Sequence, residues 1–244
     1  MVVLSPEESH HLARVLRVEA GQELTLFDGQ GTRAEGVVDT VTKKEVTVRI
    51  TARETVPPPA VEITLIQAVC KPDRFELILQ KATELGIRRI QPVITQNASL
   101  PAGKIEKMAE RGEAIIRNAA QQCGTVWLPE FLPLQKFSAV AVKADAVFIG
   151  SLHPNAKPFR EVFHPSAARE APLSRGNDQR EWQSLHKSKI KTAALLIGPE
   201  GDFTEEEVNA AVAVGAIPVT FGNQILRTET AAIFGLSVLA YELF

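Results

Sequence analysis

The chain has 244 residues, of which 45% are hydrophobic and 23% charged, and its formal net charge is −2. This length suits one large domain or two smaller ones, and the composition is ordinary for a soluble globular protein. The near balance of charge excludes a strongly basic nucleic-acid binder, so any RNA-binding surface must be a local patch. No apolar stretch reaches the roughly 18 residues that span a bilayer, and the N-terminus shows no secretion signal, so we expect a cytoplasmic protein.

Cys70 and Cys123 are the two cysteines, and their spacing matches no metal site. We expect both to be buried, reduced thiols rather than a disulfide. His10 and His11 also have no Cys, Asp or Glu partner at metal-ligand spacing. The sequence therefore predicts a protein without a metal.

The first 56 residues predict a small β-domain. Segments 23–29, 34–41 and 45–50 alternate apolar with polar residues and are rich in Val, Ile, Thr and Phe. This pattern is typical of a small β-barrel. Three consecutive prolines then form a stiff spacer, so we place a linker at 57–60 and a second domain at 61–244.

In the second domain, apolar runs predict buried strands and apolar residues at helical spacing predict long helices. The strands are expected at 61–70, 87–95, 146–150, 193–198 and 216–222, and the helices at 72–86, 102–123 and 228–243. This alternation indicates an α/β domain on a mostly parallel sheet. Residues 160–191 are charged and poorly patterned, so we expect an irregular surface excursion there.

The strand at 193–198 stops abruptly at the sequence GPEGD (198–202), and a helix start with capping-box spacing follows. Such a loop lies at the carboxyl edge of a sheet, where open α/β folds bind ligands. Glycine lets backbone approach a ligand closely, whereas a tight connector without a binding role is the alternative. Glu200 and Asp202 would repel a phosphate, so a ligand with positive charge fits better.

Two further loops follow apolar strands. Residues 221–232 hold Arg227 and Glu229 beside a short apolar step, and residues 150–154 hold Leu152 and His153. Three such loops would line one pocket with backbone polar groups, small apolar contacts and carboxylates. That environment suits an adenosyl group attached to a cationic sulfonium.

With these features, the chain resembles the RsmE family of the SPOUT (trefoil-knot) superfamily, bacterial methyltransferases that modify N3 of a uridine in 16S ribosomal RNA. The resemblance spans nearly the whole chain in the family's order. The matching segments are HHLARVLR (10–17), GQELTLFDGQG (21–31), KPDRFELILQKATELGI (71–87), NAAQQCG (118–124), LHP (152–154), LLIGPEGDF (195–203) and ILRTETAA (225–232).

The resemblance implies an N-terminal PUA-like β-barrel for RNA and a C-terminal SPOUT α/β domain with a deep trefoil knot. It also implies an obligate homodimer, S-adenosyl-L-methionine as methyl donor, and a part in rRNA processing and ribosome maturation. The implied target is the uridine conventionally numbered 1498 in the 16S rRNA of the small ribosomal subunit.

On this basis we expect the cofactor to lie between the three loops. The residues expected to bind it are Leu152, His153, Ile197, Gly198, Pro199, Glu200, Gly201, Gly222, Ile225, Leu226 and Thr230. Arg227 is the best candidate for stabilising a negative charge on the uracil, with a structural ion pair as its alternative. Glu229 is the best candidate for the base, followed by Glu200, although Glu229 could instead complement the dipole of its helix.

The resemblance makes Arg14 and Arg17 RNA contacts on one helix face, with a solvated charged face as the alternative. The basic residues Lys71, Arg74, Lys81 and Arg88 are further candidates for RNA phosphates. Lys81 could equally form an ion pair with Glu84 or Glu76.

Three positions depart from the family's usual pattern: Asp202 in place of a glycine, and Thr125 and Gln224 in place of arginines. They leave two other functions open, a methyltransferase that acts on another RNA such as tRNA, and a catalytically weak RNA-binding relative.

Overall fold

The computed structural model describes residues 1–42, 44–98, 101–164 and 190–244. The chain divides into two compact units, Met1–Pro58 and Pro59–Phe244. The expected excursion at 160–191 lies largely outside the described residues. Its first residues form part of the short helix α4 (Phe159–Phe163), and strand β11 (Thr192–Ile197) follows it.

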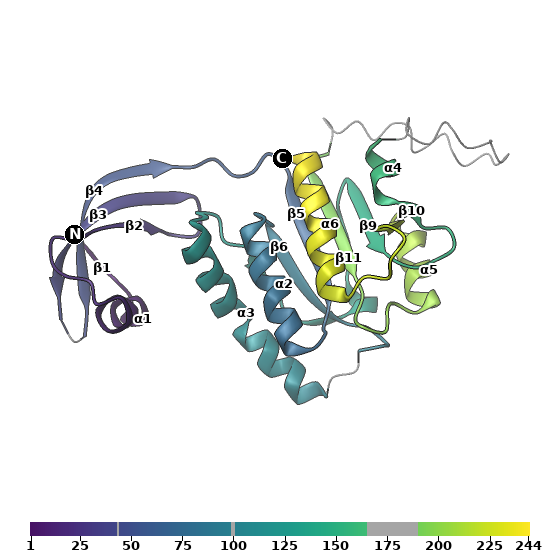
Figure 1. The fold of residues 1–244 in the computed structure, drawn as a ribbon, viewed down its shortest axis with the longest axis horizontal. Helices are drawn as coiled ribbons and strands as arrows, with labels where there is room; N and C mark the ends of the chain where they lie inside the picture. The colour runs from purple at the N-terminus through teal and green to yellow at the C-terminus, as the bar shows by residue number, and fades with distance from the viewer. Residues whose placement is uncertain (43, 99–100, 165–189) are drawn as a thin grey trace. The chain divides into compact units, whose positions relative to one another are not determined.

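The N-terminal unit is built on a four-stranded antiparallel sheet (Figure 1). In spatial order its strands are β1 (Val2–Val3), β4 (Val46–Thr55), β3 (Thr32–Val41) and β2 (Glu23–Phe27). Val38, Val46 and Val48 form its small core. This sheet is the small β-domain that the sequence pattern predicted, and among the described residues no pairing joins β1 to β2.

Helix α1 (Pro6–His10) continues directly into a π-helix at His11–Leu16. Ser5 caps α1, because its Oγ accepts a hydrogen bond from Glu8 N at 3.2 Å. Arg17 follows the π-helix in a left-handed conformation with φ of 53°. Arg14 and Arg17 are both exposed, but Arg14 lies in the π-helix and Arg17 follows it, so neither is in the regular α-helix that their spacing predicted.

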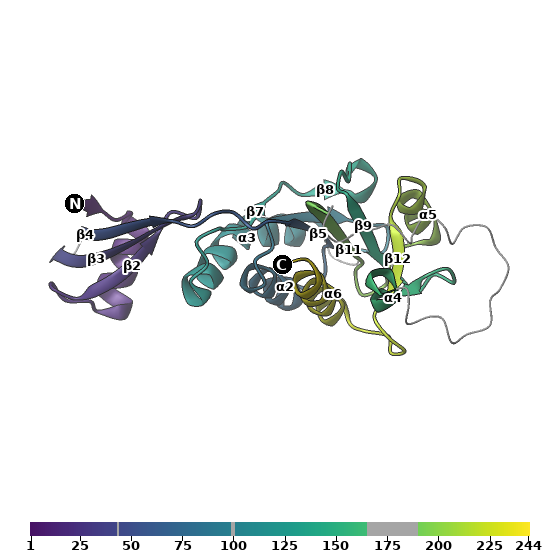
Figure 2. The ribbon, with the colours of Figure 1, turned by 90° about the horizontal axis from the view of Figure 1, so that it is seen from above.

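A parallel sheet forms the centre of the C-terminal unit (Figure 2). Its order is β10-β12-β9-β11-β5-β6-β7, and β8 also pairs with β6. The longer strands are β5 (Glu62–Ala68), β6 (Arg89–Ile94), β9 (Ala146–Gly150), β11 and β12 (Ile217–Thr220). The short strands β7 (Glu130–Phe131), β8 (Gln135–Lys136) and β10 (Lys157–Pro158) were not predicted.

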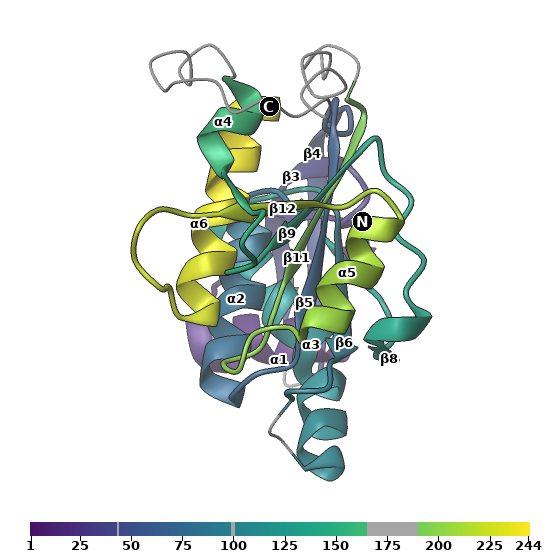
Figure 3. The same ribbon diagram turned by 90° about the vertical axis from the view of Figure 1, so that its right-hand side faces the viewer.

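Helices cover both faces of this sheet, and Figure 3 shows α2 and α6 on one side of the strands and α5 on the other. The helices are α2 (Pro72–Glu84), α3 (Ala102–Cys123), α5 (Glu205–Ala213) and α6 (Thr228–Leu243). Along β11, Leu195 and Ile197 pack in the core with α2, α3 and α6, whereas Leu196 packs in the core with α5. Burial on both faces explains why these strands are continuously apolar.

The two cysteines are free thiols, but only Cys70 is buried. Cys123 is the last residue of α3 and is exposed, so the expectation that both are buried was wrong for this residue. No helix in the described part of the chain is long and apolar enough to cross a membrane.

Gly235 of α6 lies against β11, and we predict that Gly235→Ala destabilises the C-terminal unit. A Cβ at this position would lie 2.8 Å from Leu195 Cδ2 and 3.1 Å from Phe221 Cζ. Overpacking outweighs the gain in helix propensity, so the free energy of unfolding should fall by about 1 kcal/mol or more in a denaturant titration. Gly103→Ala in α3 is the control, because its Cβ would meet nothing within 4 Å and should not destabilise.

Candidate functional site

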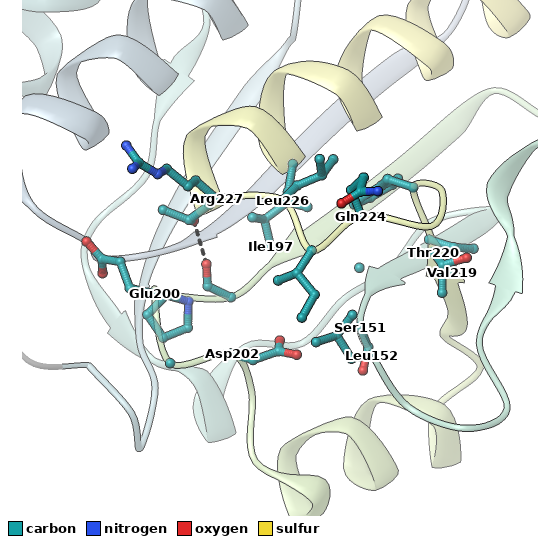
Figure 4. Close-up of a pocket in the computed structure, with 18 of the residues that line it drawn as sticks. Ser151, Leu152, Ile197, Glu200, Asp202, Val219, Thr220, Gln224, Leu226 and Arg227 are labelled. Carbon is teal, nitrogen blue, oxygen red and sulfur yellow. Dashed lines mark hydrogen bonds between the residues drawn. The ribbon is translucent and has the colours of Figure 1, made fainter.

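The loops after β9, β11 and β12 line one cavity of about 540 Å³. These three strands are neighbours in the order β12-β9-β11 and run parallel, so their carboxyl ends meet at one edge of the sheet. Figure 4 shows residues of all three loops around the cavity, among them Ser151, Glu200 and Gln224. The site therefore lies where open α/β sheets bind ligands.

The loop after β11 folds tightly because it contains small residues. A Cβ on Gly198 would lie 3.1 Å from the Asp202 carboxylate, and one on Gly201 would lie 3.2 Å from Asn97 Cβ. Asn97 Nδ2 donates to the carbonyl oxygens of Gly201 and Asp202, both at 3.0 Å. The backbone of this loop is thus held in place and forms one wall of the cavity.

A buried polar chain joins this loop to α6 and β5. Thr228 Oγ1 donates a hydrogen bond to the Gly198 carbonyl oxygen at 2.6 Å, which Figure 4 marks by a dashed line. Gln67 Nε2 in turn donates to Thr228 Oγ1 at 3.2 Å and to the Ala68 carbonyl oxygen at 2.9 Å. Because Gln67 and Thr228 are both buried, water cannot replace these bonds cheaply.

Arg74 of α2 lies between two carboxylates beside the cavity. Its NH1 is 3.5 Å from Glu200 Oε1, and its Nε is 3.8 Å from Glu229 Oε2. Glu200 Oε1 also accepts from the backbone N–H of Lys71 at 3.2 Å, which ties the loop to the start of α2. Glu229 Oε2 is buried and has no hydrogen-bond partner among the described residues.

Cys70 lies near this charge cluster, but the environment makes it a poor nucleophile. Burial raises the pKa of its thiol far above the ordinary value, and the charges of Glu200 and Glu229 raise it further. Across the described residues, no group of three or more His, Cys, Asp or Glu side chains could hold a metal ion.

Arg227 differs from Arg74 in having no carboxylate at ion-pair distance in the described part of the chain. It is the N-cap residue of α6, it is exposed, and it lines the cavity. The alternative of a structural ion pair is therefore not supported, and the Arg227 guanidinium can meet a ligand.

The structure brings most of the predicted cofactor residues to the cavity. Those that line it are Leu152, Ile197, Gly198, Pro199, Glu200, Gly201, Gly222, Ile225 and Leu226. His153 and Thr230 are not among the lining residues, and His153 Nδ1 instead accepts from Asn155 N at 3.2 Å. Of the candidate catalytic residues, Glu200 and Arg227 line the cavity, whereas Glu229 does not and instead forms an ion pair with Arg74.

Sequence reasoning missed several residues of this site. The cavity is also lined by Arg74, Ser151, Val219, Thr220, Phe221, Thr228 and Ala231. The importance of Gln67 could have been predicted from the sequence, because a glutamine inside a buried apolar strand needs a hydrogen-bond partner. That of Thr228 could not, since threonine is common at the start of a helix.

The six residues predicted to contact RNA lie in different environments. Lys71 is exposed like Arg14 and Arg17, whereas Arg74 is held by the two glutamates. Lys81 forms an ion pair with Glu84 at 2.8 Å. The guanidinium carbon of Arg88 lies 4.8 Å from the centre of the Trp127 ring.

Residues 57–240 match the RNA methyltransferase domain family, and residues 4–51 match the RNA methyltransferase PUA domain. The chain therefore belongs to this family of RNA methyltransferases. Its relatives include proteins named ribosomal RNA small subunit methyltransferase E, which confirms the resemblance to the RsmE family. The relative from Mycobacterium bovis is 27% identical over 98% of this chain and 86% of its own length. The relative from Bacillus subtilis is 25% identical, with 98% and 89% covered.

Solved structures confirm the mixed α/β fold with a small N-terminal β-unit. A putative methyltransferase from Legionella pneumophila, solved with bound cofactor SAM, is 32% identical with a TM-score of 0.77. The ribosomal RNA small subunit methyltransferase E of Neisseria gonorrhoeae, bound to S-adenosyl methionine, is 28% identical with a TM-score of 0.77. Each similarity covers 98% of this chain and 91% of the solved chain.

Thr228→Val should destabilise the protein, because it removes the hydroxyl that links Gln67 to the Gly198 carbonyl while keeping the side-chain shape. Leaving these buried groups unpaired should lower the free energy of unfolding by about 1–3 kcal/mol in a denaturant titration. Ser237→Ala is the matched control, since Ser237 Oγ donates only to Ile233 O within α6, at 2.7 Å. An equal effect of the two substitutions would contradict a special role of Thr228.

Proposed function

We propose that this protein transfers a methyl group from S-adenosyl-L-methionine to N3 of a uridine in 16S ribosomal RNA, in the course of rRNA processing and ribosome maturation. The position conventionally numbered 1498 is the target that the family implies. One observation supports this proposal most strongly: the loops after three parallel strands line a single cavity. The chain that forms this cavity belongs to an RNA methyltransferase family. Because the proposed substrate is bacterial ribosomal RNA, we also propose that the protein acts in the cytoplasm.

The cavity fits this cofactor in size and chemistry. Its volume of about 540 Å³ lies within the range of roughly 300–1,000 Å³ common for ligand sites. Leu152, Ile197 and Leu226 provide apolar surface for an adenine ring, and the glycine backbone provides polar groups at close range. Two carboxylates, of Glu200 and Asp202, suit a ligand that carries positive charge.

The bound cofactor would supply an electrophilic methyl group, and the residues of this chain must make the uracil nucleophilic. Uracil N3 carries a weakly acidic imide proton with a pKa near that of a phenol, about 10. Arg227 would stabilise the negative charge that develops on O2 or O4 as this proton leaves. The loops after β9, β11 and β12 would hold the cofactor, which would supply the methyl group that N3 receives.

A base must accept the N3 proton, and Glu229 and Glu200 remain the candidates. Glu200 lines the cavity, but its Oε1 already accepts from Lys71 N and faces Arg74. Glu229 has the buried oxygen without a hydrogen-bond partner among the described residues, and it lies in the first turn of α6, two residues after Arg227. We therefore keep Glu229 as the first candidate, which would take the proton through a bridging water because it does not line the cavity.

RNA would contact exposed basic residues in both units. Arg14 and Arg17 of the N-terminal unit and Lys71 at the start of α2 have exposed side chains that can reach phosphates. Arg74, Lys81 and Arg88 have intramolecular partners, so they would have to exchange these for RNA.

We also propose a homodimer and a trefoil knot, as the family resemblance implies. Phe234 and Tyr241 of the apolar helix α6 are 44% and 88% exposed, which supports a protein contact on this helix. For the knot, the support is that the chain leaves β12 and returns beyond β9 to pack α6 against β11, β5 and α2.

The proposal is tested by incubating the protein with tritiated S-adenosyl-L-methionine and either free 16S rRNA or small subunits that lack the modification. We expect the label to appear as 3-methyluridine in 16S rRNA. Label in tRNA would favour the other RNA substrate, and RNA binding without transfer would favour a catalytically weak relative, which Thr125 and Gln224 keep open.

Arg227→Ala should lower kcat for RNA methylation by about 100-fold, since it removes the charge that stabilises the uracil anion. Cofactor affinity, measured by calorimetry, should change little. Arg111→Ala is the control, because Arg111 lies on α3, pairs with Glu76 and is 69% exposed. Full turnover in the Arg227 variant would refute the assigned role.

A further inference from the structure

Asp202 has an unusual backbone conformation at the wall of the cavity. Its φ of 57° is left-handed, and among non-glycine residues of the described chain only Arg17 shares such a positive φ. For most side chains this conformation costs roughly 1–2 kcal/mol, but aspartate adopts it more readily because its short polar side chain forms local hydrogen bonds.

Hydrogen bonds hold Asp202 in this conformation from three directions. Its N–H donates to the Pro199 carbonyl oxygen at 3.0 Å, and its own carbonyl oxygen accepts from Asn97 Nδ2 at 3.0 Å. Asp202 Oδ1 accepts from Phe203 N at 2.8 Å. These bonds fix both the backbone and the direction of the carboxylate.

The carboxylate faces the cavity and has no cation at hand. Figure 4 shows it projecting from the loop toward Ser151 and Leu152, which line the opposite side. Within the described residues no ion pair involves Asp202, whereas the Glu200 carboxylate has Arg74 at 3.5 Å. Asp202 thus gives this part of the cavity a negative charge that has no ion-pair partner among the described residues.

We propose that Asp202 makes the cavity selective for the positively charged sulfonium of S-adenosylmethionine over the neutral thioether of its demethylated product, S-adenosylhomocysteine. This inference rests on the proposed function. Both compounds carry the same amino and carboxylate groups, which neutralise each other, so they differ only in the methyl group and in the positive charge that it gives the sulfur. A sulfonium cannot donate a hydrogen bond, and its recognition depends on a nearby negative charge. The charge of Asp202 would therefore promote product release.

Asp202→Asn is the test, because it changes charge and little else. Asparagine tolerates the left-handed conformation and keeps the Oδ1 acceptor for Phe203 N. Isothermal titration calorimetry with both compounds should show that the variant binds S-adenosylmethionine about three- to tenfold more weakly. Its affinity for S-adenosylhomocysteine should stay unchanged, so the ratio of the two dissociation constants shifts by the same factor.

Glu205→Gln is the matched control, since Glu205 is an exposed carboxylate in the first turn of α5 and does not line the cavity. It should leave both affinities unchanged. An unaltered ratio in Asp202→Asn, whether both affinities fall together or neither falls, would overturn the inference and leave the proposed function standing. Failure of the unchanged protein to bind either compound would overturn the proposed function as well.

Discussion

One hydrogen bond, from Thr228 Oγ1 to the Gly198 carbonyl oxygen at 2.6 Å, joins two of the three loops that line the cavity. Gly198 directly follows the central strand β11, and Thr228 begins α6, so the bond sets the distance between a strand end and a helix start. Gln67 reinforces it from β5, the next strand of the sheet. The cavity is thus held together by buried polar contacts in which each partner comes from a different part of the chain.

Charge is distributed unevenly around this frame. Glu200 and Glu229 both face Arg74, which keeps their mutual repulsion in check and binds the loop after β11 to α2. Arg227 and Asp202 remain without ion-pair partners in the described chain, and both line the cavity. This arrangement suits the proposed reaction. The unpaired anion can face the positively charged methyl donor, and the unpaired cation can face the uracil as it becomes negative.

Sequence periodicity predicted the long elements well, because burial on one or two faces leaves a regular signal. The strand at 146–150 and the helix at 228–243 have the predicted bounds. Strands of two residues, such as β7, β8 and β10, are too short to show any period. Side-chain partners were not predictable either. Arg74 and Glu200 are 126 residues apart, so the sequence shows that both are charged but not that they lie close together in the fold. The three loops were found because each follows an apolar strand, and parallel strands end at one edge.

The side-chain amide of Asn97 already donates hydrogen bonds to two carbonyl oxygens, those of Gly201 and Asp202. This same residue opens the tripeptide Asn97-Ala98-Ser99, the acceptor pattern for N-linked glycans. A sugar attached to that nitrogen would leave at most one hydrogen for two acceptors and would place a bulky group against the loop. Production of this protein through a eukaryotic secretory route would therefore damage the cavity wall, whereas expression in a bacterial cytosol leaves Asn97 unmodified.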